Sequence, residues 1–164
     1  MRRKLTTLLA GVVLVLGGVL AATAASSGSA SAAVTSPIRS QHNTNLCLTL
    51  AHFNQGDGGS VHMYQCNGAS TQQWIFNGFE IRSAFNGKCL DAAFGNSDNG
   101  ASVAMFTCHG GGPQQWYRPY GGAIRTWMSG NRCLEISGAN YWPGAAIQLW
   151  DCANPQAWQR WWTA

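Results

Sequence analysis

The chain has 164 residues, of which 10% are charged and 11% are aromatic, whereas soluble domains ordinarily carry about 25% charged residues. The formal net charge of +4 falls to +1 beyond residue 32, because Arg2, Arg3 and Lys4 lie before that point and no acidic residue does. Binding to a phosphate backbone requires clustered lysine and arginine, so we expect no nucleic-acid partner. All 18 aromatic residues follow Pro37, which argues against disorder.

Residues 1–32 have the form of a secretory signal peptide: a basic start, an apolar stretch and a run of small residues. Ala30-Ser31-Ala32 has the Ala-x-Ala form of a cleavage site, so we expect cleavage after Ala32; Ala22-Thr23-Ala24 is the alternative site. A retained anchor is disfavoured by Gly17-Gly18 within the apolar stretch. We therefore expect a secreted, extracellular protein with no membrane span after leader removal, since no later apolar run is long enough.

Six cysteines in a small exported domain predict three disulfides. Six cysteines permit 15 pairings, but equal spacings of 19 residues favour one of them. The predicted bridges are Cys47–Cys66, Cys89–Cys108 and Cys133–Cys152. With no Cys-x-x-Cys and no paired histidine spacing, we predict no metal site and no cofactor.

After a short segment at 33–37, the chain consists of three copies of one unit, which we place at 38–80, 81–123 and 124–164. Each copy opens on Ile-Arg followed by Ser or Thr, continues with Cys-Leu, and has a glycine eight residues before its second cysteine. Each closes on Gln-x-Trp, and in the third copy the motif is either Gln156-Ala157-Trp158 or Gln159-Arg160-Trp161. We prefer the second, because a one-residue insertion is tolerated in a loop.

Short strands with period-two alternation precede each second cysteine, and no helical period persists beyond the leader. The alternation places one pair of apolar side chains per copy on one face: Val61 and Met63, Val103 and Met105, Ile147 and Leu149. One such unit cannot bury a core alone, so we expect the three to close into an all-β, three-fold barrel with these faces inside. The Gln-x-Trp tryptophans recur at the repeat period and are predicted to belong to the core.

Three repeats of about 43 residues with Cys-Leu-Asp-like and Gln-x-Trp motifs resemble the ricin-B-type lectin family. The resemblance runs from about Ile38 to Trp162 and implies a β-trefoil fold and a carbohydrate partner, either a glycan or a plant-type polysaccharide. Members of this family also serve as carbohydrate-binding modules of secreted polysaccharide hydrolases. We therefore expect a lectin for galactose- or xylose-type glycans.

The resemblance also implies where the sugar binds. In the family a carboxylate follows Cys-Leu, an aromatic residue lies two positions before the second cysteine, and a glutamine often lies four before it. The implied carbohydrate-binding residues are Asp91, Phe106 and His109 in the second repeat, and Glu135, Gln148 and Trp150 in the third. The first repeat has Thr49 in place of the acid, so we rank the second repeat first, the third next and the first last.

Two other functions remain open. The asparagine that often precedes Gln-x-Trp in the family is missing, which favours a protein-binding trefoil, such as a protease inhibitor or toxin-associated subunit, with decayed sugar sites. An enzyme is the third reading, but a glycosidase needs two carboxylates at a set separation. Asp91 and Glu135 occupy equivalent places in different repeats, so we predict no catalytic residues.

Tyr141-Trp142 has no counterpart in the other copies and is expected either to line the third site or to cover the barrel end.

Overall fold

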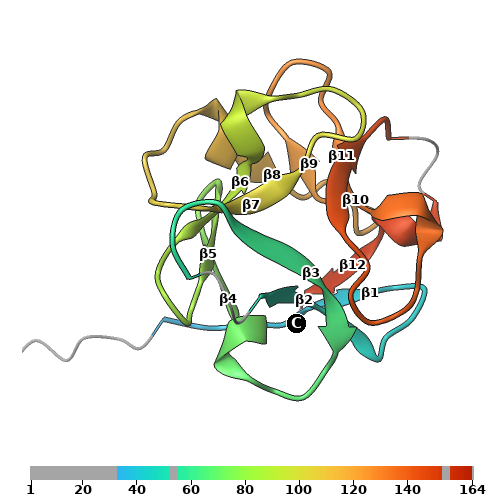
Figure 1. Ribbon diagram of the computed structural model, residues 1–164. Coiled ribbons are helices and arrows are strands. Elements are labelled where there is room, and N and C mark those ends of the chain that lie inside the picture. The colour runs from blue at the N-terminus through green and yellow to red at the C-terminus, as the bar shows by residue number, and fades with distance from the viewer. Residues whose placement is uncertain (1–32, 52–54, 153–155, 164) are drawn as a thin grey trace, which may run out of the picture. The chain divides into compact units, whose positions relative to one another are not determined.

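The computed structural model describes residues 33–51, 55–152 and 156–163 (Figure 1). The predicted leader at 1–32 lies outside the described residues. The described chain holds twelve strands and five single 3₁₀ turns, and no α-helix. The strands are β1 Ile38–Ser40, β2 Leu46–Leu50, β3 Gly59–Gln65, β4 Trp74–Asn77, β5 Glu80–Ser83, β6 Cys89–Ala92, β7 Val103–Phe106, β8 Trp116–Tyr117, β9 Arg125–Thr126, β10 Cys133–Ile136, β11 Ile147–Trp150 and β12 Trp161–Thr163. The 3₁₀ turns are η1 Ser70–Gln72, η2 Ala93–Gly95, η3 Gly112–Gln114, η4 Ser137–Ala139 and η5 Ala157–Gln159.

The twelve strands form three four-stranded units, one for each sequence repeat. Within a unit the first strand pairs with the second and the second with the third, all antiparallel. The fourth strand pairs with the first strand of the next unit, as β4 does with β5, β8 with β9 and β12 with β1. The third strands, β3, β7 and β11, meet in the middle of Figure 1. This is the β-trefoil architecture expected from the repeats.

The core is built from the strand faces that the alternation predicts. Val61 and Met63 are at most 4% exposed, and their counterparts in β7 and β11 are buried as well. Twenty-one buried side chains, taken from all three repeats, form one apolar cluster. No single repeat encloses this cluster, so burial of apolar surface makes folding of the three units mutually dependent.

The repeated glycine eight residues before each second cysteine closes the barrel. Gly58 donates its N–H to Met105 in the second repeat, Gly100 donates to Leu149 in the third, and Gly144 donates to Met63 in the first. All three glycines have φ between 82° and 95°, a left-handed conformation that a side chain disfavours. The glycines therefore let the backbone of one repeat turn against the third strand of the next.

Each Gln-x-Trp tryptophan is buried and occupies the same place in its repeat. The indole Nε1 of Trp74 donates to Leu48, that of Trp116 donates to Leu90, and that of Trp161 donates to Leu134, at 2.9 to 3.1 Å. The core role of these tryptophans is confirmed, and so is Gln159-Arg160-Trp161 as the third motif. Trp158 of the alternative register is only half-buried.

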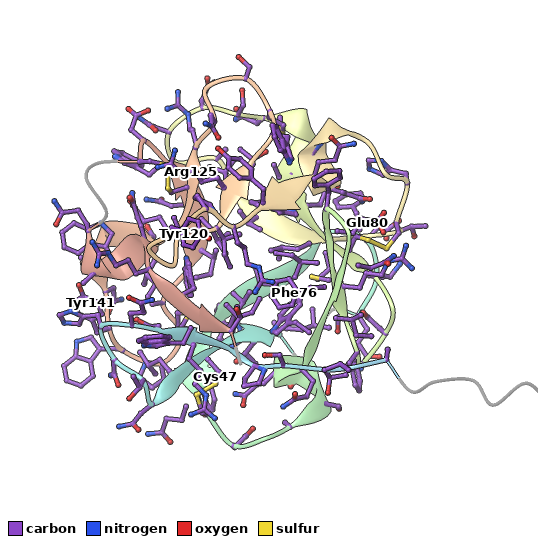
Figure 2. The ribbon with its side chains drawn as sticks, turned by 180° about the vertical axis from the view of Figure 1, so that it is seen from behind. Cys47, Phe76, Glu80, Tyr120, Arg125 and Tyr141 are labelled. Atoms are coloured by element: carbon purple, nitrogen blue, oxygen red, sulfur yellow. A yellow bond between two sulfur atoms is a disulfide. The ribbon has the colours of Figure 1, made fainter. Side chains whose placement is uncertain are left out.

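The three predicted disulfides are present, with Cα–Cα distances of 5.1 to 5.2 Å. Each joins the start of its repeat's second strand to the segment that follows the third strand. The Cys47–Cys66 disulfide of the first repeat is drawn in yellow beside the Cys47 label in Figure 2. Among the described residues, no helix is long and apolar enough to cross a membrane.

Candidate functional site

The glutamine of each Gln-x-Trp motif links the core to the residue that follows Cys-Leu. The side-chain amides of Gln72, Gln114 and Gln159 donate to backbone carbonyls of residues 65, 107 and 151, at 2.8 to 3.0 Å. The same amides reach outward: Gln72 donates to the Thr49 hydroxyl at 3.1 Å, and Gln159 donates to Glu135 at 2.5 Å. The motif that fills the core therefore also orients the candidate ligand-binding group.

The third repeat brings its three predicted site residues together. Glu135 on β10 lies opposite Gln148 on β11, and the Gln148 amide donates to Glu135 Oε1 at 2.8 Å. Glu135 is only 5% exposed, whereas Trp150, two residues beyond Gln148, is 41% exposed. The fold thus holds an oriented carboxylate beneath an accessible aromatic ring.

A hollow of about 260 Å³ lies over this carboxylate. Its walls include Trp150 on one strand and Trp158 on η5, and its floor includes Glu135 and Gln159. Sequence reasoning missed Trp158 as a site residue, because it considered Trp158 only as an alternative core position. The signal was its place directly before Gln159, where the family often has asparagine.

Tyr141 and Trp142 do not line this hollow. The Tyr141 ring stacks on His42 with a centroid distance of 3.8 Å and packs against the core. Burial raises the pKa of the Tyr141 hydroxyl. Trp142 is 76% exposed.

In the second repeat, His109 is brought to Asp91. The His109 Nε2 lies 3.4 Å from Asp91 Oδ2, and His109 Nδ1 accepts the N–H of Gly111 at 3.0 Å. Because Nδ1 is an acceptor, neutral His109 carries its proton on Nε2 and directs it towards the carboxylate. A Cβ at Gly111 would lie 2.8 Å from His109 Nδ1, so the glycine permits this approach.

Asp91 is 3% exposed. Burial raises the pKa of its carboxyl, and hydrogen bonds from Gln114 and His109 together with the charge interaction with His109 counteract part of that effect. Phe106, the predicted aromatic partner, is half-buried on β7. The second repeat therefore has a carboxylate that already has polar neighbours and an aromatic residue less open than Trp150.

Sequence reasoning also missed Phe94, three residues after Asp91. Its side chain is 94% exposed, and its φ of 60° and ψ of 17° are left-handed. The equivalent position in the third repeat is Gly138, with φ 61°. A non-glycine residue in this conformation is strained by about 1–2 kcal/mol, and strained positions cluster at functional sites.

The first repeat has a hollow of about 300 Å³, although its acid position holds Thr49. Its other walls include Tyr64, which is 46% exposed, and Thr71, whose buried hydroxyl has no hydrogen-bond partner among the described residues. The hollow contains no carboxylate. A neutral hydroxyl is a weaker acceptor than a carboxylate, which is consistent with ranking this repeat last.

Comparisons with known proteins agree with this architecture. The ricin-type β-trefoil lectin domain matches residues 77–164, and a ricin-type β-trefoil lectin domain-like family matches residues 17–106. Each match covers more than half of the chain, so the chain belongs to the ricin-type β-trefoil lectin family. Domains of this family are non-catalytic.

Several solved structures share the fold. ThreeFoil, a designed three-fold symmetric protein, is 22% identical with a TM-score of 0.71, covering 79% of this chain and 97% of its own. The ricin B-like lectin of Macrolepiota procera, solved with lactose, is 23% identical with a TM-score of 0.66 and coverage of 81% and 96%. The C-half of the earthworm R-type lectin, solved with GalNAc, is 18% identical with a TM-score of 0.66 and coverage of 79% and 96%. A search of curated protein sequences gives no match. Membership of this lectin family supports carbohydrate binding.

Proposed function

We propose that the chain is a secreted, non-enzymatic lectin that recognises galactose- or xylose-type glycans through shallow sites on its repeats. The observation that carries this proposal is the third-repeat hollow, which Glu135, Trp150 and Trp158 line together. A sugar presents a rim of hydroxyl donors and an apolar face of C–H groups. A carboxylate beside exposed aromatic rings complements both.

Glu135 keeps acceptor capacity for a ligand even though two amides contact it. Its two oxygens each accept one amide, from Gln148 and Gln159, and a carboxylate has about four acceptor positions. Two adjacent sugar hydroxyls then donate to the remaining positions in charge-assisted hydrogen bonds. The amides fix the carboxylate in place, so little side-chain entropy is lost when the sugar binds.

The second repeat is the next candidate site, with Asp91 as acceptor, His109 beside it, and Phe106 and Phe94 as its aromatic residues. We place it after the third repeat because His109 already points its Nε2 at Asp91. A sugar hydroxyl there competes with the imidazole, which lowers the net gain. Two amides also donate to Glu135, and Gln159 is one of the residues that line its hollow, but no imidazole or other cationic group lines that hollow.

A glycan array probed with the purified protein tests the ligand class. We expect glycans with terminal galactose or xylose to bind and the signal to fall with Glu135→Gln. Monosaccharide affinity should be near the millimolar level, worth about −4 kcal/mol, because a shallow hollow contacts few ligand atoms. If no glycan binds while the protein is folded, a protein-binding trefoil with decayed sugar sites becomes the better account. The residues before the three Gln-x-Trp motifs, Thr71, Pro113 and Trp158, favour that rival.

A further inference from the structure

Three aromatic side chains outside the hollows of the first and third repeats form one group at the surface, here named the hairpin aromatic cluster: Phe79, Tyr117 and Trp127. The Trp127 ring lies 5.8 Å from the Phe79 ring and 4.6 Å from the Tyr117 ring, between centroids. Phe79 is 57% exposed and Trp127 is 54% exposed. Trp127 therefore joins the other two rings in one apolar surface.

The pseudo-three-fold symmetry shows that the fold does not require aromatic residues here. The N–H of each Gln-x-Trp tryptophan donates to one carbonyl of a neighbouring segment, and the acceptors are Phe79, Gly122 and Ser36. Directly after the first strand of each repeat, one residue donates its backbone N–H to the carbonyl of the middle residue of a Gln-x-Trp motif. These three donors are Trp127, Gln41 and Ala84. The residues after the three tryptophans are Tyr117, Trp162 and Ile75.

These residues form three symmetry-related sets of three, and only the set of Phe79, Tyr117 and Trp127 is aromatic throughout. The others carry Gly122, Trp162 and Gln41, or Ser36, Ile75 and Ala84, and make the same backbone hydrogen bonds. Phe79 and Trp127 are exposed, Tyr117 is half-buried, and none of the three belongs to the buried apolar cluster, so the core does not account for them either. Exposed apolar groups that the fold does not need commonly mark an interaction surface.

A hollow of about 260 Å³ adjoins the cluster and shares no lining residue with the hollows of the first and third repeats. Phe79 and Tyr117 line it together with Phe76, Glu80 and Arg118; Phe76 and Glu80 are labelled in Figure 2. The Arg118 guanidinium lies 4.0 Å above the Phe76 ring and donates to Thr163. Arg82 donates to Glu80 at 2.5 and 2.9 Å.

Glu80 is paired with Arg82, and Arg118, which stacks on Phe76, is the one cation among the residues that line this hollow. Aromatic walls with one carboxylate and one guanidinium suit a neutral ligand that has both an apolar face and hydroxyl groups. An anionic lipid surface is held by clusters of lysine and arginine, which the residues that line this hollow do not supply. A second copy of the chain would need about 800 Å² on each partner, far more than three rings provide.

We infer that the hairpin aromatic cluster and its hollow form an additional contact site for a neutral polysaccharide chain, built from residues that belong to none of the candidate sites of the repeats. The choice of ligand rests on the proposed lectin function. Two separate contacts on one chain raise the affinity for a polymer through effective concentration, whereas a monosaccharide gains nothing from linkage.

The test replaces cluster residues by those that the symmetry places at the equivalent positions, so that the fold already tolerates them. The cluster variant is Phe79→Ser with Trp127→Gln, matching Ser36 and Gln41. The control is Trp162→Ile, which removes an exposed aromatic at the position equivalent to Tyr117 and matches Ile75. Affinity gel electrophoresis with soluble galactomannan and soluble xylan measures polymer binding, and calorimetry with galactose and xylose measures monosaccharide binding.

We expect the cluster variant to lose about tenfold in polysaccharide affinity, with wild-type monosaccharide affinity and melting temperature, and the control to bind as wild type. Wild-type polysaccharide binding by the cluster variant would overturn the inference, as would a wild-type protein that binds neither polymer. Loss of co-sedimentation with phosphatidylserine–phosphatidylcholine vesicles, or loss of self-association, in place of loss of polymer binding would reassign the cluster to lipid or to a second copy. If the wild type binds polysaccharide but no monosaccharide, and the cluster variant loses polysaccharide binding, the inferred contact site is supported. The proposed sugar sites of the repeats are then wrong.

Discussion

Gln159 donates its side-chain amide to Glu135 at 2.5 Å, so the motif that anchors the third repeat in the core also holds the acid of its candidate sugar site. The same amide donates to the carbonyl of Asp151 at 2.9 Å. Gln72 and Thr49 have the corresponding relationship in the first repeat. The fold and the candidate sugar site therefore share one side chain in each of these repeats.

Gln159→Ala should lower both stability and sugar affinity. It leaves one buried Glu135 oxygen without its donor, at a cost of roughly 1–3 kcal/mol, and it also removes the donor to the Asp151 carbonyl. Thermal unfolding and sugar titration of the same variant check both effects. An unchanged melting temperature would show that the buried amide is not structurally important.

Trp158 and Trp161 should differ in their effect on sugar binding. Trp158→Ala removes a wall of the hollow over Glu135 and is expected to weaken sugar binding, with some loss of stability because Trp158 also packs against the core. Trp161→Phe removes the indole donor to Leu134 and should destabilise the protein by about 1–3 kcal/mol, with smaller effect on sugar binding. Wild-type sugar binding by a folded Trp158→Ala would contradict the separate roles. Trp162→Ala, in an exposed position outside the hollow, is the control.

Phe94→Gly should separate stability from binding in the second repeat. Glycine adopts the left-handed conformation without strain, as Gly138 does in the third repeat, and the exposed Phe94 ring contributes little burial. The free energy of unfolding should rise by up to about 1 kcal/mol, because relief of strain outweighs the added freedom of the unfolded chain. Sugar affinity in the second repeat should fall. If chemical denaturation shows that Phe94→Gly is clearly less stable than the wild type, the backbone at Phe94 is not strained.

Acidification should weaken sugar binding at the second repeat before it unfolds the protein. Burial raises the pKa of Asp91, so this carboxylate loses its charge at a higher pH than an ordinary aspartate, whose pKa is about 3.9. Because the folded state binds this proton more tightly than the unfolded state, protonation of Asp91 favours folding as the pH falls through its raised pKa. Sugar titrations from pH 7 downwards on a Glu135→Gln background report on this repeat. Loss of affinity only together with thermal unfolding would disagree with the assignment.

The repeat pattern was sufficient to predict the architecture because its markers are local and recur three times. The cysteine spacing, the alternating strands and Gln-x-Trp each fix a backbone segment, and the structure confirms all three. The sequence left two positions for the third Gln-x-Trp motif. The structure decides between them, because the Trp161 indole donates to the Leu134 carbonyl as Trp74 and Trp116 do to Leu48 and Leu90.

The details of the site depended on contacts between segments that no spacing reveals. The approach of His109 to Asp91 depends on Gly111, and the wall formed by Trp158 depends on where η5 lies relative to β11. Phe94 carries no motif, and only its backbone angles and exposure single it out. The preference for the third repeat over the second follows from these contacts. The predicted site residues themselves await a binding measurement.

The most direct test of the proposed function is calorimetric titration of the wild type, Glu135→Gln and Asp91→Asn with galactose and with xylose, alongside their melting curves. Glu135→Gln keeps the shape of the side chain and removes the charge, which should cost roughly 1.5–3 kcal/mol of hydrogen bonding to the sugar, or about a tenfold or greater loss of affinity, with the fold intact. Asp91→Asn should reduce binding less, and its melting temperature should equal or exceed that of the wild type, because a buried charge is removed. Unchanged sugar binding by a folded Glu135→Gln, or no binding by the wild type, would contradict the account.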